Sequence, residues 1–125
     1  MTTITDVRTI AIDVRDQDTA LAFYTDTLGF EKRLDALISP TTRWIEVAPR
    51  GASTSIALTE ADDAPTPVGT ETGIRFTVPD AEAERDALQA RGVTVGDLLR
   101  WDDVPTMFTF DDPDGNRFVV VEAMR

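Results

Sequence analysis

Apolar residues alternate with polar or small ones along residues 7–14, near the start of the chain. A period of two predicts a β-strand with one buried face. The spacing of apolar residues then changes to three and four, which predicts an amphipathic helix of about three turns. Asp16 or Asp18 can cap the amino end of this helix, and Gly29 supplies the left-handed residue that ends it.

Short apolar runs after this helix predict three strands, separated by Ser-Pro and Pro-Arg-Gly sequences that favour turns. The segment 61–70 is acidic, rich in Pro and Ala and without periodicity, so we expect an exposed connector. The order then begins again. The strands expected before the connector are 30–37, 42–47 and 53–59, and after it come strand 73–78, a helix from Asp80 to Arg91 ended by Gly92, and strands 93–101, 106–110 and 117–122.

Three landmarks recur at nearly the same offset in the two halves. The capping residues Asp16 and Asp80 are 64 positions apart, and the helix-ending residues Gly29 and Gly92 are 63 apart. A Pro-x-Gly turn also recurs, at Pro49–Gly51 and Pro113–Gly115. A duplicated βαβββ unit explains these offsets together. We therefore predict an α+β fold in a single domain, 1–125, with repeat one at 5–60, the connector at 61–70 and repeat two at 71–123.

Composition limits the chemistry that this chain can perform. Its 125 residues are a common size for one domain that buries its own core. It has no cysteine and no histidine, which excludes disulfides, thiolate chemistry and the commonest metal ligand and general base. Its net charge of −11 would repel phosphate backbones and anionic membranes, so nucleic acid and membrane partners are not expected. No segment approaches the ~20 apolar residues that cross a bilayer, so we expect a soluble, cytoplasmic protein.

The segment Asp16–Phe30, which ends in Ala-Phe-Tyr-Thr-Asp-Thr-Leu-Gly-Phe, resembles the first-helix signature of the vicinal oxygen chelate superfamily. Two further landmarks resemble that superfamily in the same order: Arg91-Gly92-Val93 after the second helix, and Asp111–Asn116 before the last strand. The superfamily includes glyoxalase I, bleomycin-resistance proteins and extradiol dioxygenases. The resemblance implies two half-barrels with helices on the convex side, a ligand cavity on the concave side and a homodimer.

Enzymes of this superfamily typically hold one divalent metal with four side chains. The resemblance places those four side chains at Thr9, Ala57, Gly73 and Val119. None of these residues replaces the usual His, Glu or Gln, and no immediate neighbour is a normal ligand for a divalent metal. Metal-activated chemistry therefore cannot be carried over from the enzymes. The pattern matches the metal-free binding proteins of the superfamily, so we expect no metal and no other cofactor.

Strand alternation predicts which side chains face the cavity. The apolar set of each first strand should pack under its helix, which leaves the opposite set, mostly small residues, on the concave side. Trp44, Trp101 and Met107 are expected to add aromatic and adaptable apolar surface. The predicted ligand-binding residues are Thr9, Ala11, Asp13, Trp44, Ser55, Ala57, Gly73, Arg75, Trp101, Met107, Thr109 and Val119.

Some of these residues have a second interpretation. Trp44 also fits half-buried packing, and Trp101 lies where a strand gives way to a loop. Asp13 and Arg75 either pair on the concave side or reach solvent separately. If Asp13 were buried without a partner, it would suit a general base, since no histidine is present for that role.

The leading functional hypothesis is a metal-free protein that binds a small apolar or aromatic molecule, such as an antibiotic or secondary metabolite, and confers resistance by sequestering it. The alternative is an enzyme of the same fold. It would be a glyoxalase-like lyase or isomerase with Asp13 or Glu46 as base, or a dioxygenase-type enzyme whose metal ligands lie elsewhere. A third hypothesis is an accessory dimer whose cavity is filled by its own side chains. The missing metal donors favour binding over catalysis.

Overall fold

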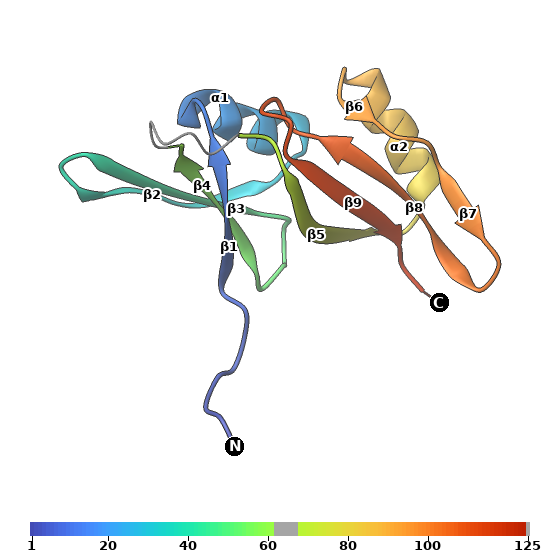
Figure 1. Cartoon of the computed structure of the whole chain (residues 1–125), viewed down its shortest axis with the longest axis horizontal. Helices are drawn as coiled ribbons and strands as arrows, with labels where there is room; N and C mark the ends of the chain where they lie inside the picture. The colour runs from blue at the N-terminus through green and yellow to red at the C-terminus, as the bar shows by residue number, and fades with distance from the viewer. Residues whose placement is uncertain (62–67, 125) are drawn as a thin grey trace. The chain divides into compact units, whose positions relative to one another are not determined.

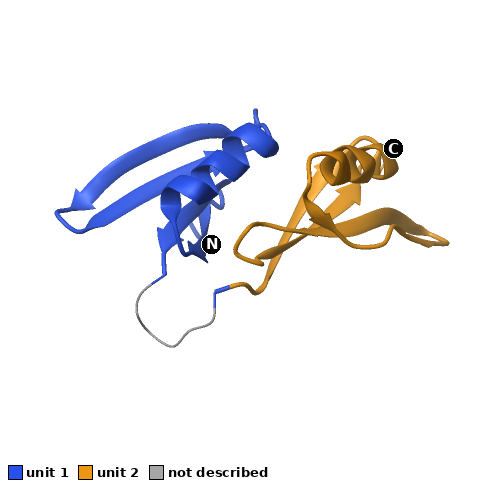
Figure 2. Cartoon of the chain, turned by 90° about the horizontal axis from the view of Figure 1, so that it is seen from above, with its two compact units in different colours: residues 1–68 blue, residues 69–125 orange. Residues whose placement is uncertain are grey.

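The chain divides between residues 68 and 69 into two units, each built on one β-sheet and one main helical segment (Figure 2). The structure is a computed structural model that describes residues 1–61 and 68–124. The strands and the helical segment of each unit position the side chains of that unit.

The sheet of the first unit has four strands in the order β1-β4-β3-β2 (Figure 1). The first and last of these strands in the chain, β1 and β4, run parallel, whereas β3 is antiparallel to both of its neighbours. This topology brings together segments that lie more than forty residues apart in the sequence. The strands are β1 (Thr9–Val14), β2 (Glu31–Ser39), β3 (Thr42–Ala48) and β4 (Ser55–Glu60).

The predicted first helix begins as α1 (Gln17–Ala22), and Asp16 rather than Asp18 is its cap. The Asp16 carboxylate accepts a hydrogen bond from a backbone N–H of the first turn at 2.9 Å. The helix then widens into one π-helical turn, η1 (Phe23–Thr27), before Gly29 ends it with a φ of 77°. The predicted position is therefore correct, but the last turn is a π-turn rather than the expected α-turn.

The helical segment covers one face of this sheet, and the core of the unit lies between them. Tyr24 from η1 is completely buried, and its ring contacts those of Phe23 and Phe30 at centroid distances of 5.2 and 5.9 Å. Burying each large apolar side chain contributes about 1.5–3 kcal/mol. The buried apolar strand residues on this face are Ile12, Val14, Ile45, Val47, Ile56 and Leu58.

The second unit repeats the plan with a longer set of strands. The strand order in its sheet is β5-β9-β8-β6, and β7 also pairs with β8. The first and last strands, β5 and β9, again run parallel. Phe76, Phe110 and Phe118 form one aromatic cluster with centroid distances of 5.2–6.1 Å. The elements are β5 (Glu71–Val78), α2 (Ala81–Ala90), β6 (Thr94–Val95), β7 (Leu99–Trp101), β8 (Val104–Asp111) and β9 (Arg117–Glu122).

The landmarks that predicted a repeat have the same local structure in both units. Asp80 caps α2 as Asp16 caps α1, with its carboxylate accepting from Ala83 N at 3.0 Å. Gly92 ends the second helical segment with a φ of 84°, which matches the conformation of Gly29. The α+β fold of two βαβββ repeats is confirmed, with β6 and β7 together in the place of β2.

The predicted single strand 93–101 is wrong, because it is interrupted between β6 and β7. Gly96 lies in the gap, and its N–H donates to Thr109 O at 2.8 Å. Its carbonyl accepts a 2.6 Å hydrogen bond from Arg85 Nε on α2. Gly96 thus keeps one hydrogen bond to β8 through its N–H, while its carbonyl bonds to the helix, and regular strand pairing resumes only at β7. The bounds of the other predicted strands agree with the structure within two residues.

A second correction concerns Ile10, which was expected to pack under the helix with Ile12 and Val14. Ile10 is 37% exposed, whereas the other two are buried. Its register is as predicted, opposite Ile56. The exposure arises because β1 is an edge strand and Ile10 lies near its start, away from the helical segment that follows Val14.

Residues 62–67 of the predicted connector lie outside the described residues. The exposed connector and the single-domain boundaries therefore stay predictions. Among the residues that the structure describes, no helix is both long enough and apolar enough to cross a membrane.

The turn between β8 and β9 is held by a buried carboxylate. Asp112 is 5% exposed, and its Oδ1 accepts hydrogen bonds from the backbone N–H groups of Asp114 and Asn116 at 2.9 and 2.8 Å. Its Oδ2 accepts a third hydrogen bond, from Asn116 Nδ2, at 3.0 Å. The carboxylate thus fixes the turn from which β9 enters the sheet between β5 and β8.

We predict that Asp112→Ala lowers the free energy of unfolding by about 2–4 kcal/mol, because it leaves buried donors without their charged acceptor. Asp86→Ala is the matched control, since Asp86 is exposed on α2 and Ala suits a helix. Urea unfolding followed by circular dichroism measures both. A loss at Asp112 no greater than the change at Asp86 would contradict the structural role given to this carboxylate.

Candidate functional site

The face of the first sheet opposite α1 collects the predicted cavity residues of the first half. Side chains at paired positions of neighbouring strands lie on the same face of a sheet. Glu46 on β3 is opposite Ala57 on β4, so Glu46 belongs to this face, and so does Trp44, two residues earlier. The β1–β4 pairs on it are Thr9 with Ser55, Ala11 with Ala57 and Asp13 with Thr59.

We call this face, with its residues from β1, β3 and β4, the β1–β4 face. Its side chains are mostly small or polar rather than uniformly apolar. Ala11 and Asp13 are exposed, and Thr9 and Trp44 are half-buried. Ser55 and Ala57 are buried. The predicted parity of these residues is therefore found in the structure, whereas their role in ligand binding stays a prediction.

A buried carboxylate lies in the middle of the β1–β4 face. Glu46 is only 5% exposed. Its Oε1 accepts a hydrogen bond from Ser55 Oγ at 2.6 Å, and its Oε2 accepts one from Trp44 Nε1 at 2.9 Å. Arg8 adds a longer contact, with its guanidinium 3.5 Å from Oε2 and its side chain 78% exposed. Ser55 Oγ also lies 2.8 Å from Thr9 Oγ1, which extends the network to β1.

These hydrogen bonds change the acidity of Glu46. The hydroxyl of Ser55 lowers the pKa of the Glu46 carboxyl most strongly, and the Trp44 indole and Arg8 lower it further. Burial opposes them, because it raises the pKa of a carboxyl. The net shift is downward from the ordinary value of 4.5, so Glu46 is ionised at neutral pH.

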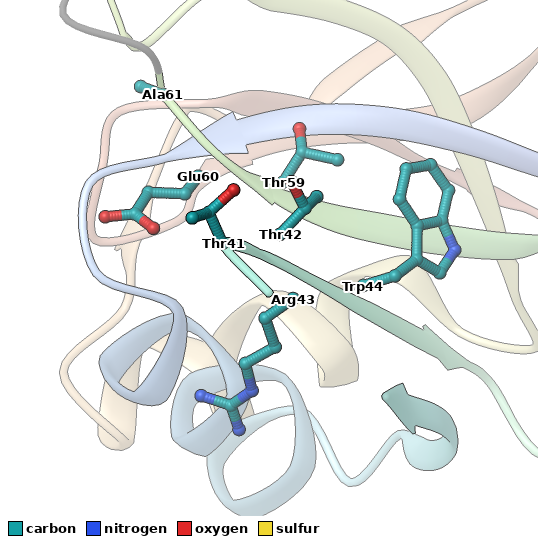
Figure 3. Close-up of a pocket in the computed structure, with 7 residues that line it drawn as sticks. All are labelled: Thr41, Thr42, Arg43, Trp44, Thr59, Glu60 and Ala61. Carbon is teal, nitrogen blue, oxygen red and sulfur yellow. The ribbon is translucent and has the colours of Figure 1, made fainter. Parts of the chain in front are cut away.

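Two hollows open beside the Trp44–Glu46 pair. One, of about 200 Å³, is lined by Glu46 and Ser55 together with residues of the neighbouring segments. The other, of about 300 Å³, is lined by Trp44 and Thr59, and Figure 3 shows the Trp44 indole at one end of it. The further lining residues are Arg8, Arg33, Leu34 and Ser53 for the first hollow, and Thr41, Thr42, Arg43, Glu60 and Ala61 for the second.

Arg43 lines the second hollow but its guanidinium is already engaged. It donates two hydrogen bonds of 2.8 Å to the carboxylate of Asp35 and one of 2.8 Å to Asp18. In Figure 3 its side chain extends toward the helix, away from the Trp44 ring. The pKa of Arg43 is raised, above all by the hydrogen bonds that it donates to Asp35 and Asp18. Arg43 thus ties α1 to β2 and β3 and does not offer its charge to a ligand.

In the second unit, the register places most of the predicted residues on one face. Arg75 is opposite Val119, and Val119 is opposite Thr109. Met107 pairs with Val121, two residues beyond Val119, and is half-buried. Gly73 lies at a register irregularity of β5 with a φ of 73°. Phe108 and Phe110 point to the opposite face and are buried, as expected for core residues.

Trp101 does not share the register of Met107 and Thr109. It pairs with Val104 at the tip of the β7–β8 hairpin, beyond an irregularity in the ladder. Val104 has the strand parity of Phe108 and Phe110, not that of Met107. Trp101 is 55% exposed. Its predicted ligand-stacking role stays a prediction that the strand register does not support.

Asp13 and Arg75 each have a partner within their own unit. Asp13 accepts a hydrogen bond from Thr59 Oγ1 at 2.8 Å and is exposed. Arg75 donates to Gly73 O at 3.0 Å. The condition under which Asp13 would suit a general base, burial without a partner, is therefore not met. The pairing of Asp13 with Arg75 stays a prediction.

The four positions that correspond to the usual metal ligands do not fit a metal ion. Ala57, Gly73 and Val119 have no donor atom in their side chains, and the Thr9 hydroxyl lies 3.2 Å from Ser55 O. Within residues 1–61 and 68–124, no group of three or more Asp or Glu side chains is placed to hold a metal. These four positions therefore do not supply the donors that a divalent metal ion needs.

Sequence reasoning missed the centre of the β1–β4 face. From the sequence, Glu46 is expected only as a possible base of an enzyme, and Arg8 is not among the predicted site residues. The signal was present in the segment Thr42–Ala48, where a single acidic residue shares parity with Trp44 inside a largely apolar strand. Strand parity could not predict the contact between Glu46 and Arg8, because the two residues are 38 positions apart in the sequence.

Comparisons with known proteins agree with this fold. The pattern of the Glyoxalase/Bleomycin resistance protein/Dioxygenase superfamily matches residues 7–120. A member of that superfamily from Sphaerobacter thermophilus DSM 20745 has a crystal structure that superposes with a TM-score of 0.91, at 36% identity over 98% of this chain and 100% of that chain.

Two further relatives are an antibiotic binding protein and an uncharacterized protein. TnmS3, an antibiotic binding protein from Streptomyces sp. CB03234, superposes with a TM-score of 0.87 at 31% identity, over 99% of this chain and 100% of that chain. The uncharacterized protein YetH of Bacillus subtilis (strain 168) is 30% identical over 95% of this chain and 99% of its own length. The match over nearly the whole chain shows that this protein belongs to the Glyoxalase/Bleomycin resistance protein/Dioxygenase superfamily.

Proposed function

We propose that this protein binds a small aromatic molecule, with the Trp44 ring as a contact surface, and sequesters it without altering it. The observation that carries the proposal is the state of Trp44. Its indole N–H is held by Glu46 at 2.9 Å, its ring is half-buried, and it borders a hollow of about 300 Å³. A ring held in one orientation loses little conformational entropy when a ligand stacks on it.

The remainder of the β1–β4 face supports this role. Ala11 and Ala57 are small, and the hydroxyls of Thr9, Ser55 and Thr59 supply a few fixed polar groups. An aromatic surface with a small number of oriented polar groups around it is typical of small-molecule sites. The antibiotic binding by TnmS3, a structural relative, makes an antibiotic or related secondary metabolite the class of ligand that we propose here.

Catalysis by Glu46 is less well supported. A general base works best when its pKa lies near the working pH, and the pKa of Glu46 is shifted the other way. Its two carboxylate oxygens already accept hydrogen bonds from Ser55 and Trp44. We therefore propose binding, with the side chains rather than a metal ion holding the ligand.

We also propose that the protein is a homodimer, in line with its superfamily. Leu37 and Ile38 are 70% and 62% exposed on β2, an edge strand of the first sheet. Exposed apolar residues on an edge strand promote association unless a partner covers them. Light scattering coupled to size exclusion measures the mass in solution directly.

We predict that Trp44→Ala weakens binding of 2-naphthol and 2-methoxynaphthalene at least about tenfold, because it removes the aromatic surface of the site. Isothermal titration calorimetry measures both affinities, and native mass spectrometry checks that the bound probe has its original mass. Trp101→Ala is the matched variant, and we expect it to change affinity less than about twofold. Dialysis against EDTA should have no effect.

Equal losses in the two tryptophan variants would place the contact surface elsewhere. A chemically altered probe, or binding that needs an added divalent metal, would contradict sequestration and favour an enzyme.

A second prediction concerns the stability of the site at low pH. Because the folded-state pKa of Glu46 is lowered, its carboxylate stabilises the fold above the ordinary pKa of 4.5, and this contribution is lost as the pH falls through the folded-state value. Arg8 is the charged group that faces it. The free energy by which Glu46→Gln destabilises the protein should therefore shrink between about pH 7 and about pH 3. Urea unfolding at each pH measures it, and a constant or growing difference would contradict the assignment.

A further inference from the structure

The carboxylate of Glu46 has acceptor capacity beyond the hydrogen bonds that hold it. An ionised carboxylate offers about four lone-pair sites. Ser55 and Trp44 occupy two of them at 2.6 and 2.9 Å, and Arg8 approaches a third at 3.5 Å. Among the described residues, these three are the hydrogen-bond partners of Glu46. The side chain also lines the hollow of about 200 Å³, where it has 6% of its surface exposed.

Packing alone does not account for a charge at this position. Burying a carboxylate costs free energy that its hydrogen bonds must offset, and an apolar residue there would avoid that cost. The Trp44 indole could reach an uncharged amide oxygen equally well, since it donates only one hydrogen bond. The charge itself therefore calls for an explanation beyond the orientation of Trp44.

The charges around the hollow favour a hydrogen-bond donor over an anion. Arg33 lines the same hollow, but its Nε donates to Glu31 at 2.9 Å and one of its terminal nitrogens donates to Pro49 O at 3.3 Å. Arg8 is largely in solvent, where its interaction is screened. Glu46 is thus the buried charge of the hollow, and the net charge of −11 adds to the repulsion of anions.

We propose that Glu46 is the polar recognition residue of the β1–β4 face, and that the ligand is an aromatic molecule with a hydroxyl or ammonium donor beside its ring. The inference rests on the proposed function, because it needs a ligand on Trp44. The edge of the Trp44 ring is held next to the acceptor, because its Nε1 lies 2.9 Å from Glu46 Oε2. A bicyclic aromatic compound that stacks on this ring can therefore bring one donor substituent to the carboxylate.

The inference can be tested with naphthalene probes that differ in one group. 2-Naphthol and 2-naphthylmethylammonium carry a donor, whereas 2-methoxynaphthalene lacks one and 2-naphthoate is an anion. Glu46→Gln removes the charge, but its amide oxygen can still accept from Trp44 while its NH₂ group faces the Ser55 oxygen. Glu82→Gln is the matched control, because it makes the same change of net charge at an exposed site on α2.

We expect the wild-type protein to bind each donor probe at least about tenfold more tightly than 2-methoxynaphthalene, and to bind 2-naphthoate most weakly. Glu46→Gln should reduce the preference for 2-naphthol to about twofold and leave binding of the methyl ether nearly unchanged. Glu82→Gln should keep the full preference. The near-ultraviolet circular dichroism of the tryptophans should be the same in Glu46→Gln and wild type, which shows that Trp44 keeps its environment.

The outcomes separate this inference from the proposed function. If all four probes bind alike, or if Glu46→Gln keeps the preference, Glu46 does not recognise the ligand, although binding on Trp44 stands. If Glu46→Gln weakens every probe equally and changes the tryptophan spectrum, its role is to position Trp44, which also overturns the inference. If no probe binds, the proposed function fails and the inference fails with it. If Glu46→Gln does not fold, Glu46→Asp is the second variant. Its side chain is one methylene shorter, so the carboxylate is withdrawn, and most of the preference for donor probes over 2-methoxynaphthalene should be lost.

Discussion

The parallel pairing of β1 with β4 determines which side chains of the first unit can act together. It joins two segments 46 residues apart, with Thr9 opposite Ser55 and Ala11 opposite Ala57. Because side chains alternate between the faces of a strand, a slip of one residue would exchange the apolar set for the polar one. The core under α1 strongly favours the observed register. The arrangement of the β1–β4 face is therefore a consequence of core packing on the other side of the sheet.

Within that face, the buried charge of Glu46 imposes a second constraint. A carboxylate with 5% exposure must be surrounded by donors, and the chain supplies them from three different segments: Arg8, Trp44 and Ser55. The same contacts that satisfy the charge also fix the indole ring. Recognition of a donor and presentation of an aromatic surface are thus linked through one residue, and a ligand with both features would use them together.

The sequence predicts this fold well because its signals are local. Alternation in the strands, the capping by Asp16 and Asp80 and the left-handed Gly29 and Gly92 depend on near neighbours in the chain. The interrupted strand at Gly96 was missed because the hydrogen bond from Arg85 to the Gly96 carbonyl is a tertiary contact, which local alternation does not reveal. The candidate site was predicted only in part for the same reason. Parity placed Trp44 on the correct face, but the network around Glu46 joins residues up to 46 positions apart.

The central claim, that a small aromatic molecule is held against the Trp44 ring, can be tested through its indole N–H. The chain has two tryptophans, so a ¹⁵N–¹H spectrum contains two indole signals, and Trp101→Phe identifies which belongs to Trp44. The N–H of Trp44 is held by Glu46, so its signal should exchange slowly with solvent. On titration with 2-naphthol, the Trp44 signal should shift and saturate while the Trp101 signal remains in place. A shift confined to Trp101, or no saturable shift in either signal, would contradict the account.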